Sequence, residues 1–259
     1  MESDLILNVD NLSVEVNHEQ LLSGISFSVK RGEALAIIGP NGAGKTVLFR
    51  TLIGLMAYRG TVEWAKGVRI GYVPQKFFVE KSFPITVREF FLLKSKRFWI
   101  PEKKFITHLE HELALVGLKK DILAKPVSEL SGGQLQRILI SWAMLNHPDV
   151  LLFDEPTAGI DIGGEETIYT ILHKVQQERG TTILLISHDL NIVYRYADNV
   201  LCMNKAMICH GKPADVLNPK ELSHIYGEAG FYHHPDKETK QAYTACFLAP
   251  RYEQDRMKR

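Results

Sequence analysis

One glycine-rich loop, placed between a buried strand and a helix, restricts the possible folds of this chain more than any other part of its sequence. The continuous apolar run 34–38 is typical of a strand buried on both faces, and a helix is predicted from residue 45 to about residue 55. The loop between them fits the pattern G-x-x-x-x-G-K-[ST], with the residues Gly39, Pro40, Asn41, Gly42, Ala43, Gly44, Lys45 and Thr46. Strand, glycine-rich loop and helix in this order predict a P-loop that binds the phosphates of a nucleotide.

Each part of this loop has its own chemical task. The glycines allow backbone N–H groups to curl round the β-phosphate, and Lys45 reaches oxygens of the β- and γ-phosphates. The hydroxyl of Thr46 is a ligand for Mg²⁺. A glycine-rich turn without a ligand is the alternative interpretation, and the flanking strand and helix argue against it.

Two carboxylates follow a second buried strand. The apolar runs 150–153 and 181–186 predict two such strands, and a helix is predicted over 164–179 between them, which indicates a parallel sheet of the α/β class. Asp154 and Glu155 come directly after the first run, at the sheet edge where α/β proteins bind ligands. We expect Asp154 to hold Mg²⁺ and Glu155 to orient and polarise the attacking water. A strand that merely ends in acidic residues is the alternative.

Two further polar side chains fit the same sheet edge. His188 follows the strand predicted over 181–186, where it could hydrogen-bond the γ-phosphate and tie it to Glu155. Gln75 follows the segment Tyr72-Val73-Pro74 and could bind Mg²⁺ or sense the terminal phosphate. Either residue alone is weak support, since a single histidine at a strand end is usually structural.

A second phosphate site is predicted far along the chain from the P-loop. Leu130 precedes Ser131, Gly132, Gly133 and Gln134, and the pattern from 135 to 145 predicts a helix. The bare N–H groups and positive dipole end of that helix would attract an anion. An ordinary loop with a serine N-cap fits the run equally well when it is taken alone.

The remaining sequence predicts a second lobe and an additional β part. Three alternating runs near the N-terminus predict strands over 5–9, 12–16 and 24–29. We expect the first two to pair with each other at a sheet edge. Apolar residues between 86 and 147 recur at helical spacing, so this segment is interpreted as an inserted helical lobe. The resulting division is a lobe of 1–85 and 148–215, a helical lobe of 86–147 and a polar tail of 216–259, within one domain of 1–259.

Composition excludes some classes of partner. The net charge is 31 − 30 = +1, so no global basic field attracts nucleic acid or anionic lipid. No secretory leader or apolar run long enough to span a bilayer is expected. The three cysteines, Cys202, Cys209 and Cys246, have no metal-binding spacing and are interpreted as unpaired structural thiols in a reducing compartment.

Taken together, the motifs resemble those of the ATP-binding-cassette ATPases in identity and in order. The resemblance covers about residues 5 to 217 and rests on 39–46, Gln75, Leu130–Gln134, Asp154-Glu155, Ala158-Gly159-Ile160-Asp161 and His188. It implies a RecA-like P-loop core with an antiparallel β subdomain and an inserted α-helical subdomain. It also implies that ATP with Mg²⁺ lies between the P-loop of one chain and Ser131 to Gln134 of another, in a head-to-tail homodimer with Asp161 at the interface.

The resemblance further implies a motor for a membrane partner. Residues 82–90, 201–204, 211–213 and 225–227 look like segments of the ATPases that serve manganese, zinc and iron importers. The implied partners are integral membrane permease subunits and, indirectly, an extracytoplasmic solute-binding protein. The implied location is peripheral, on the cytoplasmic face of the cell (inner) membrane. An importer ATPase for another solute, a soluble ATPase of iron–sulfur cluster assembly and a non-hydrolytic scaffold are the alternatives; the intact hydrolytic residues argue against the scaffold.

Some residues depart from the family pattern or stand outside it. Val16 occupies the position of the aromatic residue that usually stacks on adenine, and Ser141-Trp142 replaces a more usual Ala-Arg. Histidines in the tail suggest a regulatory metal site, although solvated histidines are the commoner explanation; these residues are His224, His233 and His234, with Asp236 nearby.

Overall fold

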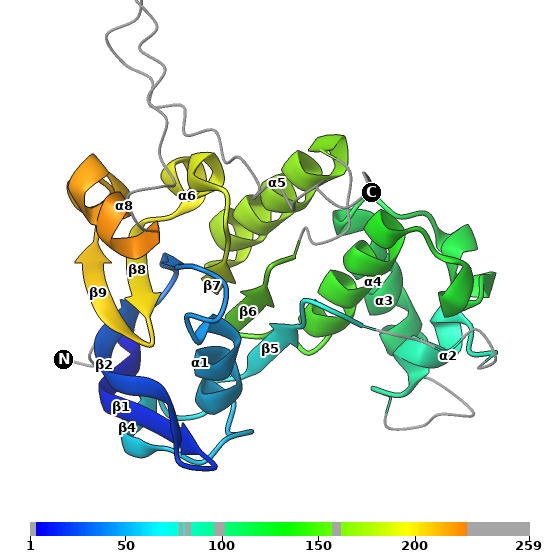
Figure 1. The fold of residues 1–259 in the computed structure, drawn as a ribbon. Coiled ribbons are helices and arrows are strands. Elements are labelled where there is room, and N and C mark those ends of the chain that lie inside the picture. Colours follow the sequence, from blue (N-terminus) through cyan, green and yellow to red (C-terminus); the bar gives the residue numbers. More distant parts are fainter. Residues whose placement is uncertain (1–3, 78–79, 81–83, 96–101, 157–161, 227–259) are drawn as a thin grey trace, which may run out of the picture.

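Two β-sheets and a group of helices make up the described part of the chain (Figure 1). This computed structural model describes residues 4–77, 80, 84–95, 102–156 and 162–226. The mixed α/β architecture, with one antiparallel sheet, one largely parallel sheet and a helical region, confirms the predicted fold class.

The larger sheet has the strand order β5-β6-β7-β3-β8-β9, and all its neighbouring pairs are parallel except β8 with β9. Every residue of the three central strands is buried, as the continuous apolar runs predicted. The strands are β5 (Ile70–Val73), β6 (Val150–Asp154), β7 (Thr182–Ile186), β3 (Ala34–Ile38), β8 (Asn199–Asn204) and β9 (Ala206–Gly211).

The smaller sheet corrects the prediction for the N-terminal strands. Residues 5–9 and 12–16 do not pair with each other but form one strand, β1 (Leu5–Val16), between β2 (Glu19–Lys30) and β4 (Arg59–Trp64). The register shifts between Val9 and Leu12, and Asn11 has a φ of 48°. This irregularity interrupts the alternation of apolar residues without reversing the chain.

The three helices whose bounds were predicted, over 45–55, 135–145 and 164–179, are found as α1, α4 and α5, with bounds that differ by up to three residues. The described residues between 86 and 147 contain α-helices and 3₁₀ turns and no named strand, as the periodicity predicted. The α-helices are α1 (Lys45–Leu52), α2 (Val87–Leu92), α3 (Lys103–Leu115), α4 (Gly132–Met144), α5 (Ile162–Arg179), α6 (Leu190–Tyr196), α7 (Pro213–Val216) and α8 (Pro219–Tyr226). Among the described residues, no helix is long and apolar enough to cross a membrane.

The central strands separate two main apolar cores. Side chains of β6 alternate between them, so that Leu152 packs with Leu48 and Phe49 of α1 and with the antiparallel sheet. Phe153 points the other way, into a core shared with α5 and with the helical lobe, whose α2, α3 and α4 lie together in Figure 1. The parallel sheet therefore packs against α1 and the antiparallel sheet on one side, and against α5 and the α2–α4 helices on the other.

The interpretation of all three cysteines as unpaired thiols is wrong for two of them. Cys202 of β8 and Cys209 of β9 stand opposite each other in the antiparallel pair and form a disulfide. Their proximity depends on the register of two strands that the sequence did not predict. Cys246 lies outside the described residues.

Candidate functional site

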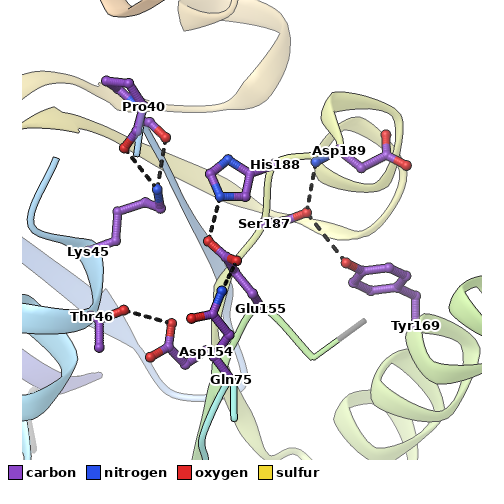
Figure 2. A network of polar contacts seen from close by, with 11 residues as sticks. Pro40, Lys45, Thr46, Gln75, Asp154, Glu155, Tyr169, Ser187, His188 and Asp189 are labelled. Carbon is purple, nitrogen blue, oxygen red and sulfur yellow. Dashed lines mark hydrogen bonds and ion pairs between the residues drawn. The ribbon is translucent and has the colours of Figure 1, made fainter. Parts of the chain in front are cut away.

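Four connections converge at the carboxyl ends of the parallel strands (Figure 2). The P-loop follows β3, the two carboxylates close β6, and His188 follows β7, which lies between those strands. Gln75 follows β5 at the same edge. Residues from four distant parts of the sequence thus meet because parallel strands present their carboxyl ends on one side.

Tight backbone packing fixes the shape of the P-loop. Gly44 is the N-cap of α1 and has a φ of 91°, in the left-handed region that favours glycine. A Cβ atom added to Gly39 would lie 2.1 Å from the carbonyl oxygen of Met203, which is too close for any side chain. The loop can therefore keep this path only with glycine at position 39.

The ammonium group of Lys45 lies inside the loop. Its side chain is 6% exposed, and Nζ donates hydrogen bonds to the carbonyl oxygens of Gly39 at 2.9 Å and Pro40 at 3.1 Å. Burial lowers the pKa of Lys45, and the charges of Glu155 and Asp154 oppose that shift. Two backbone carbonyl groups of the loop thus hold the Lys45 side chain in place.

Asp154 lies deep in the same site. It is 1% exposed and accepts hydrogen bonds from Thr46 Oγ1 at 3.1 Å and from the Tyr72 hydroxyl at 3.3 Å. Burial is the main reason why the pKa of Asp154 is raised. The hydroxyl of Thr46 and the carboxylate of Asp154 supply the hard oxygen ligands that Mg²⁺ prefers, so these residues fit a magnesium ion.

The carboxylate of Glu155 accepts hydrogen bonds from Gln75 and His188, the two other residues predicted at this sheet edge. Gln75 Nε2 donates to one of its carboxylate oxygens and His188 Nε2 donates to the other (Figure 2). The hydrogen bond from His188 is the main cause of the lowered pKa of Glu155. The backbone φ of Glu155 is 49°, which is unusual for a residue other than glycine. The carboxylate is thus ionised and held in position, and the charge of Lys45 also lowers its pKa.

A cleft of about 610 Å³ is lined by residues 41–46 of the P-loop, by Gln75 and by Glu155. Four further residues that the sequence did not indicate also line it, namely Glu19, Leu21, Val47 and Lys205. Lys205 supports the loop directly, since its backbone N–H donates to the carbonyl of Ala43 at 2.9 Å. No sequence motif marks these four residues: Val47 lies on α1, Glu19 and Leu21 lie on β2, and Lys205 lies in the turn between β8 and β9.

The run at the start of α4 does not line this cleft. Ser131 caps the helix, with its Oγ accepting from the backbone N–H of Gln134 at 3.3 Å. The Gln134 side chain in turn accepts from the backbone N–H of Ser131 at 3.2 Å. Within one chain, the run from Ser131 to Gln134 is therefore a capping box, and none of its residues is among those that line the P-loop cleft.

The departures from the family pattern have partial structural explanations. Trp142 packs inside the helical lobe, where its ring stacks on Phe90 at 5.5 Å and lies 3.7 Å from Lys94 Nζ. Val16 is 40% exposed. The predictions for Asp161, His233, His234 and Asp236 lie outside the described residues, and so does that for the side chain of His224.

Comparison with known proteins extends this description. A profile described as "ABC transporter" matches residues 22–158. The zinc import ATP-binding protein ZnuC of a Jannaschia species is 38% identical over 86% of this chain and 88% of its own length. The protein of the same name from Photorhabdus laumondii is 35% identical over 87% of this chain and 85% of its own length.

Solved structures show the same likeness. The chain cbiO1 from Clostridium perfringens, part of the ABC transporter complex cbiONQ, is 31% identical with a TM-score of 0.71, over 86% of this chain and 94% of that one. The ADP conformation of another ATP-binding cassette of an ABC transporter gives a TM-score of 0.73 at 26% identity, over 86% of this chain and 98% of that one.

Proposed function

The chain belongs to the ABC transporter family as an ATP-binding ATPase subunit, and from this premise we propose that it powers the import of a divalent transition metal ion. Zinc, manganese and iron are the candidates for the cargo. Support comes from the relatives named as zinc import proteins, which match more than four fifths of the chain. The sequence segments that resemble metal-importer ATPases point to the same cargo.

The position of Glu155 carries the proposed hydrolytic mechanism. Its ionised carboxylate lines the P-loop cleft and is fixed by Gln75 and His188. In the proposed reaction Glu155 accepts a proton from the water that attacks the γ-phosphate of ATP. Lys45 binds the β- and γ-phosphates, while His188 holds Glu155 in place and contacts the γ-phosphate.

The P-loop backbone is the proposed cradle for the remaining phosphate oxygens. Its residues are Gly39, Pro40, Asn41, Gly42, Ala43, Gly44, Lys45 and Thr46. Thr46 and Asp154 would hold Mg²⁺, with Gln75 completing the site. When bound, the ion neutralises charge that develops on the phosphate oxygens.

A second copy of the chain would complete the site. Ser131, Gly132, Gly133 and Gln134 do not line the P-loop cleft of their own chain, which supports their proposed role at the cleft of a partner. The proposed homodimer is head-to-tail and forms on ATP, with Asp161 at the interface. Because both chains would hold the γ-phosphate, hydrolysis would release them.

The proposed complex includes membrane subunits. This chain would bind integral membrane permease subunits from the cytoplasmic face of the cell (inner) membrane, and would act indirectly with an extracytoplasmic solute-binding protein. We assign 1–85 and 148–215 to the RecA-like and β lobe, 86–147 to the helical lobe and 216–259 to a tail, all within one domain.

Mixing two inactive variants tests the shared site. Ser131→Arg blocks the cleft of the partner, and Lys45→Ala disables the cleft of its own chain, so each variant alone should be inactive. In an equal mixture, half of the dimers contain both variants and retain one intact site of two, so about a quarter of the wild-type rate should return. If no activity returns although mixed dimers form, the shared-site proposal is wrong.

Uptake of labelled ions tests the cargo. Cells that lack the chain should regain uptake of one of the ions ⁶⁵Zn²⁺, ⁵⁴Mn²⁺ or ⁵⁵Fe²⁺ when the wild-type chain is restored. Glu155→Gln should not restore uptake, whereas Glu63→Gln, on the exposed part of β4, should. Equal uptake of all three ions with and without the chain would contradict the proposed cargo.

A further inference from the structure

A second group of polar side chains lies at the opposite edge of the parallel sheet, where β6 and β7 begin. A cavity of about 440 Å³ is lined there by residues that precede or start those strands, including Asp149 and Thr182. Three side chains from other elements reach the same cavity: His108 and Glu112 of α3, and His147 from the connection between α4 and β6.

These three side chains converge on one point. His108 and Glu112 stand one helical turn apart on α3, with His108 Nδ1 3.6 Å from Glu112 Oε1. The ring of His147 stacks on that of His108 with their centres 4.3 Å apart. One nitrogen or oxygen atom from each of the three residues lies within 4.8 Å of the other two.

The hydrogen bond from His108 to Leu145 leaves Nδ1 without a proton when the ring is neutral. His108 Nε2 lies 3.0 Å from the carbonyl oxygen of Leu145, which can only accept, so the network assigns the proton to Nε2. In the neutral imidazole, Nδ1 then carries a lone pair directed at Glu112 Oε1. Either a proton on Nδ1 or a metal ion between the two atoms removes this repulsion.

The separation of His108 Nδ1 from Glu112 Oε1 suits a metal ion between them. Two ligand atoms about 2.0–2.2 Å from a tetrahedral zinc ion are separated by about 3.3–3.6 Å, close to the 3.6 Å between His108 and Glu112. The Leu145 carbonyl would serve as the outer partner that fixes the imidazole of a metal-binding histidine. A metal ion at this point would therefore be bound by His108 and Glu112, with the Leu145 carbonyl orienting the His108 ring.

Glu112 is fully buried and incompletely satisfied. Its Oε2 accepts a hydrogen bond from Arg179 Nη1 at 3.1 Å. Its Oε1 lies 3.0 Å from Arg179 Nη2 but accepts no hydrogen bond from any described residue. A buried carboxylate oxygen without such a bond is costly, and it retains a lone pair for a metal ion.

We propose that His108, Glu112 and His147 form a binding site for a single divalent transition metal ion such as Zn²⁺, with water as a further ligand. Two imidazoles and one carboxylate suit zinc and its transition-metal neighbours, whereas Mg²⁺ and Ca²⁺ prefer oxygen ligands alone. His147 is exposed, which gives the ion access from solvent. The site is separate from the P-loop cleft and does not depend on the proposed transport function.

Metal titration of the full-length chain without nucleotide tests the site. His147→Asn removes one imidazole at a φ of 47°, a conformation that asparagine tolerates. His108→Gln removes another ligand and keeps a donor for the carbonyl of Leu145. His111→Gln is the matched control, since His111 lines the same cavity outside the three ligands.

We expect the wild type and His111→Gln to bind one more equivalent of Zn²⁺ than the two ligand variants. With Co²⁺ as the probe, only the first two should show the visible absorption of a tetrahedral ion at this site. The affinity lost should exceed the roughly 10–100-fold that removal of an outer-shell partner costs. All four chains share the same tail, so any Zn²⁺ bound there cancels when their Zn²⁺ stoichiometries are compared.

Two results would overturn the proposal. Equal Zn²⁺ stoichiometry in all four folded chains would show that the three residues form a salt-bridge network without a metal. The cavity also contains Arg31, Arg69 and Arg179, so inorganic phosphate is a second probe. Phosphate binding that is lost in a folded Arg31→Met chain, with no Zn²⁺ bound at the site, would assign the cavity to an anion.

Discussion

Replacing Glu155 by glutamine tests the hydrolytic site while preserving most of its contacts. In the wild type, the carboxylate accepts from Gln75 Nε2 and from His188 Nε2. In Glu155→Gln the amide oxygen can still accept from Gln75. The new amide N–H can donate to the lone pair on Nε2 of a neutral His188, whose proton then moves to the other ring nitrogen. The network survives, but the base is lost.

The size of the expected effect follows from that loss. Positioned general bases contribute about 10²- to 10⁴-fold to rate, which corresponds to about 3–5 kcal/mol of the activation barrier. ATP affinity should change little, since the Lys45 and P-loop contacts remain. Removing the charge of Glu155 also relieves Asp154, because the negative charge of Glu155 contributes to the raised pKa of Asp154.

Two measurements on the same sample decide the outcome. Phosphate release should fall by at least about a hundredfold, while size-exclusion chromatography with ATP should show a lasting dimer. Glu63→Gln, an exposed change of the same kind on β4, should hydrolyse ATP at the wild-type rate. Undiminished phosphate release by Glu155→Gln would refute Glu155 as the base.

Three further changes probe other parts of the structure. Gly39→Ala places a Cβ 2.1 Å from the Met203 carbonyl oxygen, so both the unfolding temperature and ATP affinity should fall; an unchanged value of either, by fluorimetry and nucleotide titration, would contradict this. Arg179→Met leaves the fully buried Glu112 without its guanidinium and should lower the free energy of unfolding by about 3–5 kcal/mol; a loss below about 1 kcal/mol in urea, typical of exposed pairs, would argue against it. Burial raises the pKa of Tyr72 from its ordinary value near 10 to about 12. The stability contributed by its protonated phenol is therefore complete below about pH 10 and is lost as the pH rises towards about 12. The alkaline loss of stability should be smaller in Tyr72→Phe, and an identical loss in both chains would refute this assignment.

Local sequence patterns predicted the parts of the fold that carry strong periodicity or fixed motifs. The three central strands are continuous apolar runs, and each is followed by a residue of the candidate site. Knowing that parallel strands share a carboxyl edge was enough to bring Lys45, Glu155 and His188 together. The position of each of these side chains follows from the end of the strand that precedes it.

Strands that depend on their neighbours were not predicted. Strand β5 contains Gly71, which normally disfavours a strand; here a Cβ would lie 2.6 Å from Leu151 Cδ2 of β6. The β8–β9 hairpin turns at Lys205, with a φ of 59°, and lacks the glycine that usually marks such a turn. The disulfide between Cys202 and Cys209 was missed with that hairpin.

The histidine cluster shows a similar limit. The spacing of His108 and Glu112 places them on one helical face, which a sequence can show. The third residue, His147, reaches them only because α3 packs against α4 and the chain then turns into β6. The sequence suggested a metal site at His233 and His234 of the tail instead, because these two histidines are adjacent in the sequence, whereas His108 and His147 are not.

Strand β6 connects the two polar sites of the molecule. It begins three residues after His147 and ends at Asp154, and all five of its residues are buried between β5 and β7. Its length is about 16 Å at about 3.3 Å per residue, and such a packed strand is displaced as a unit rather than absorbing a shift. Proximity along a strand does not by itself establish coupling, but linkage supplies the criterion. If Zn²⁺ changes ATP affinity through β6, ATP must change Zn²⁺ affinity by the same factor, and His147→Asn must abolish both changes together.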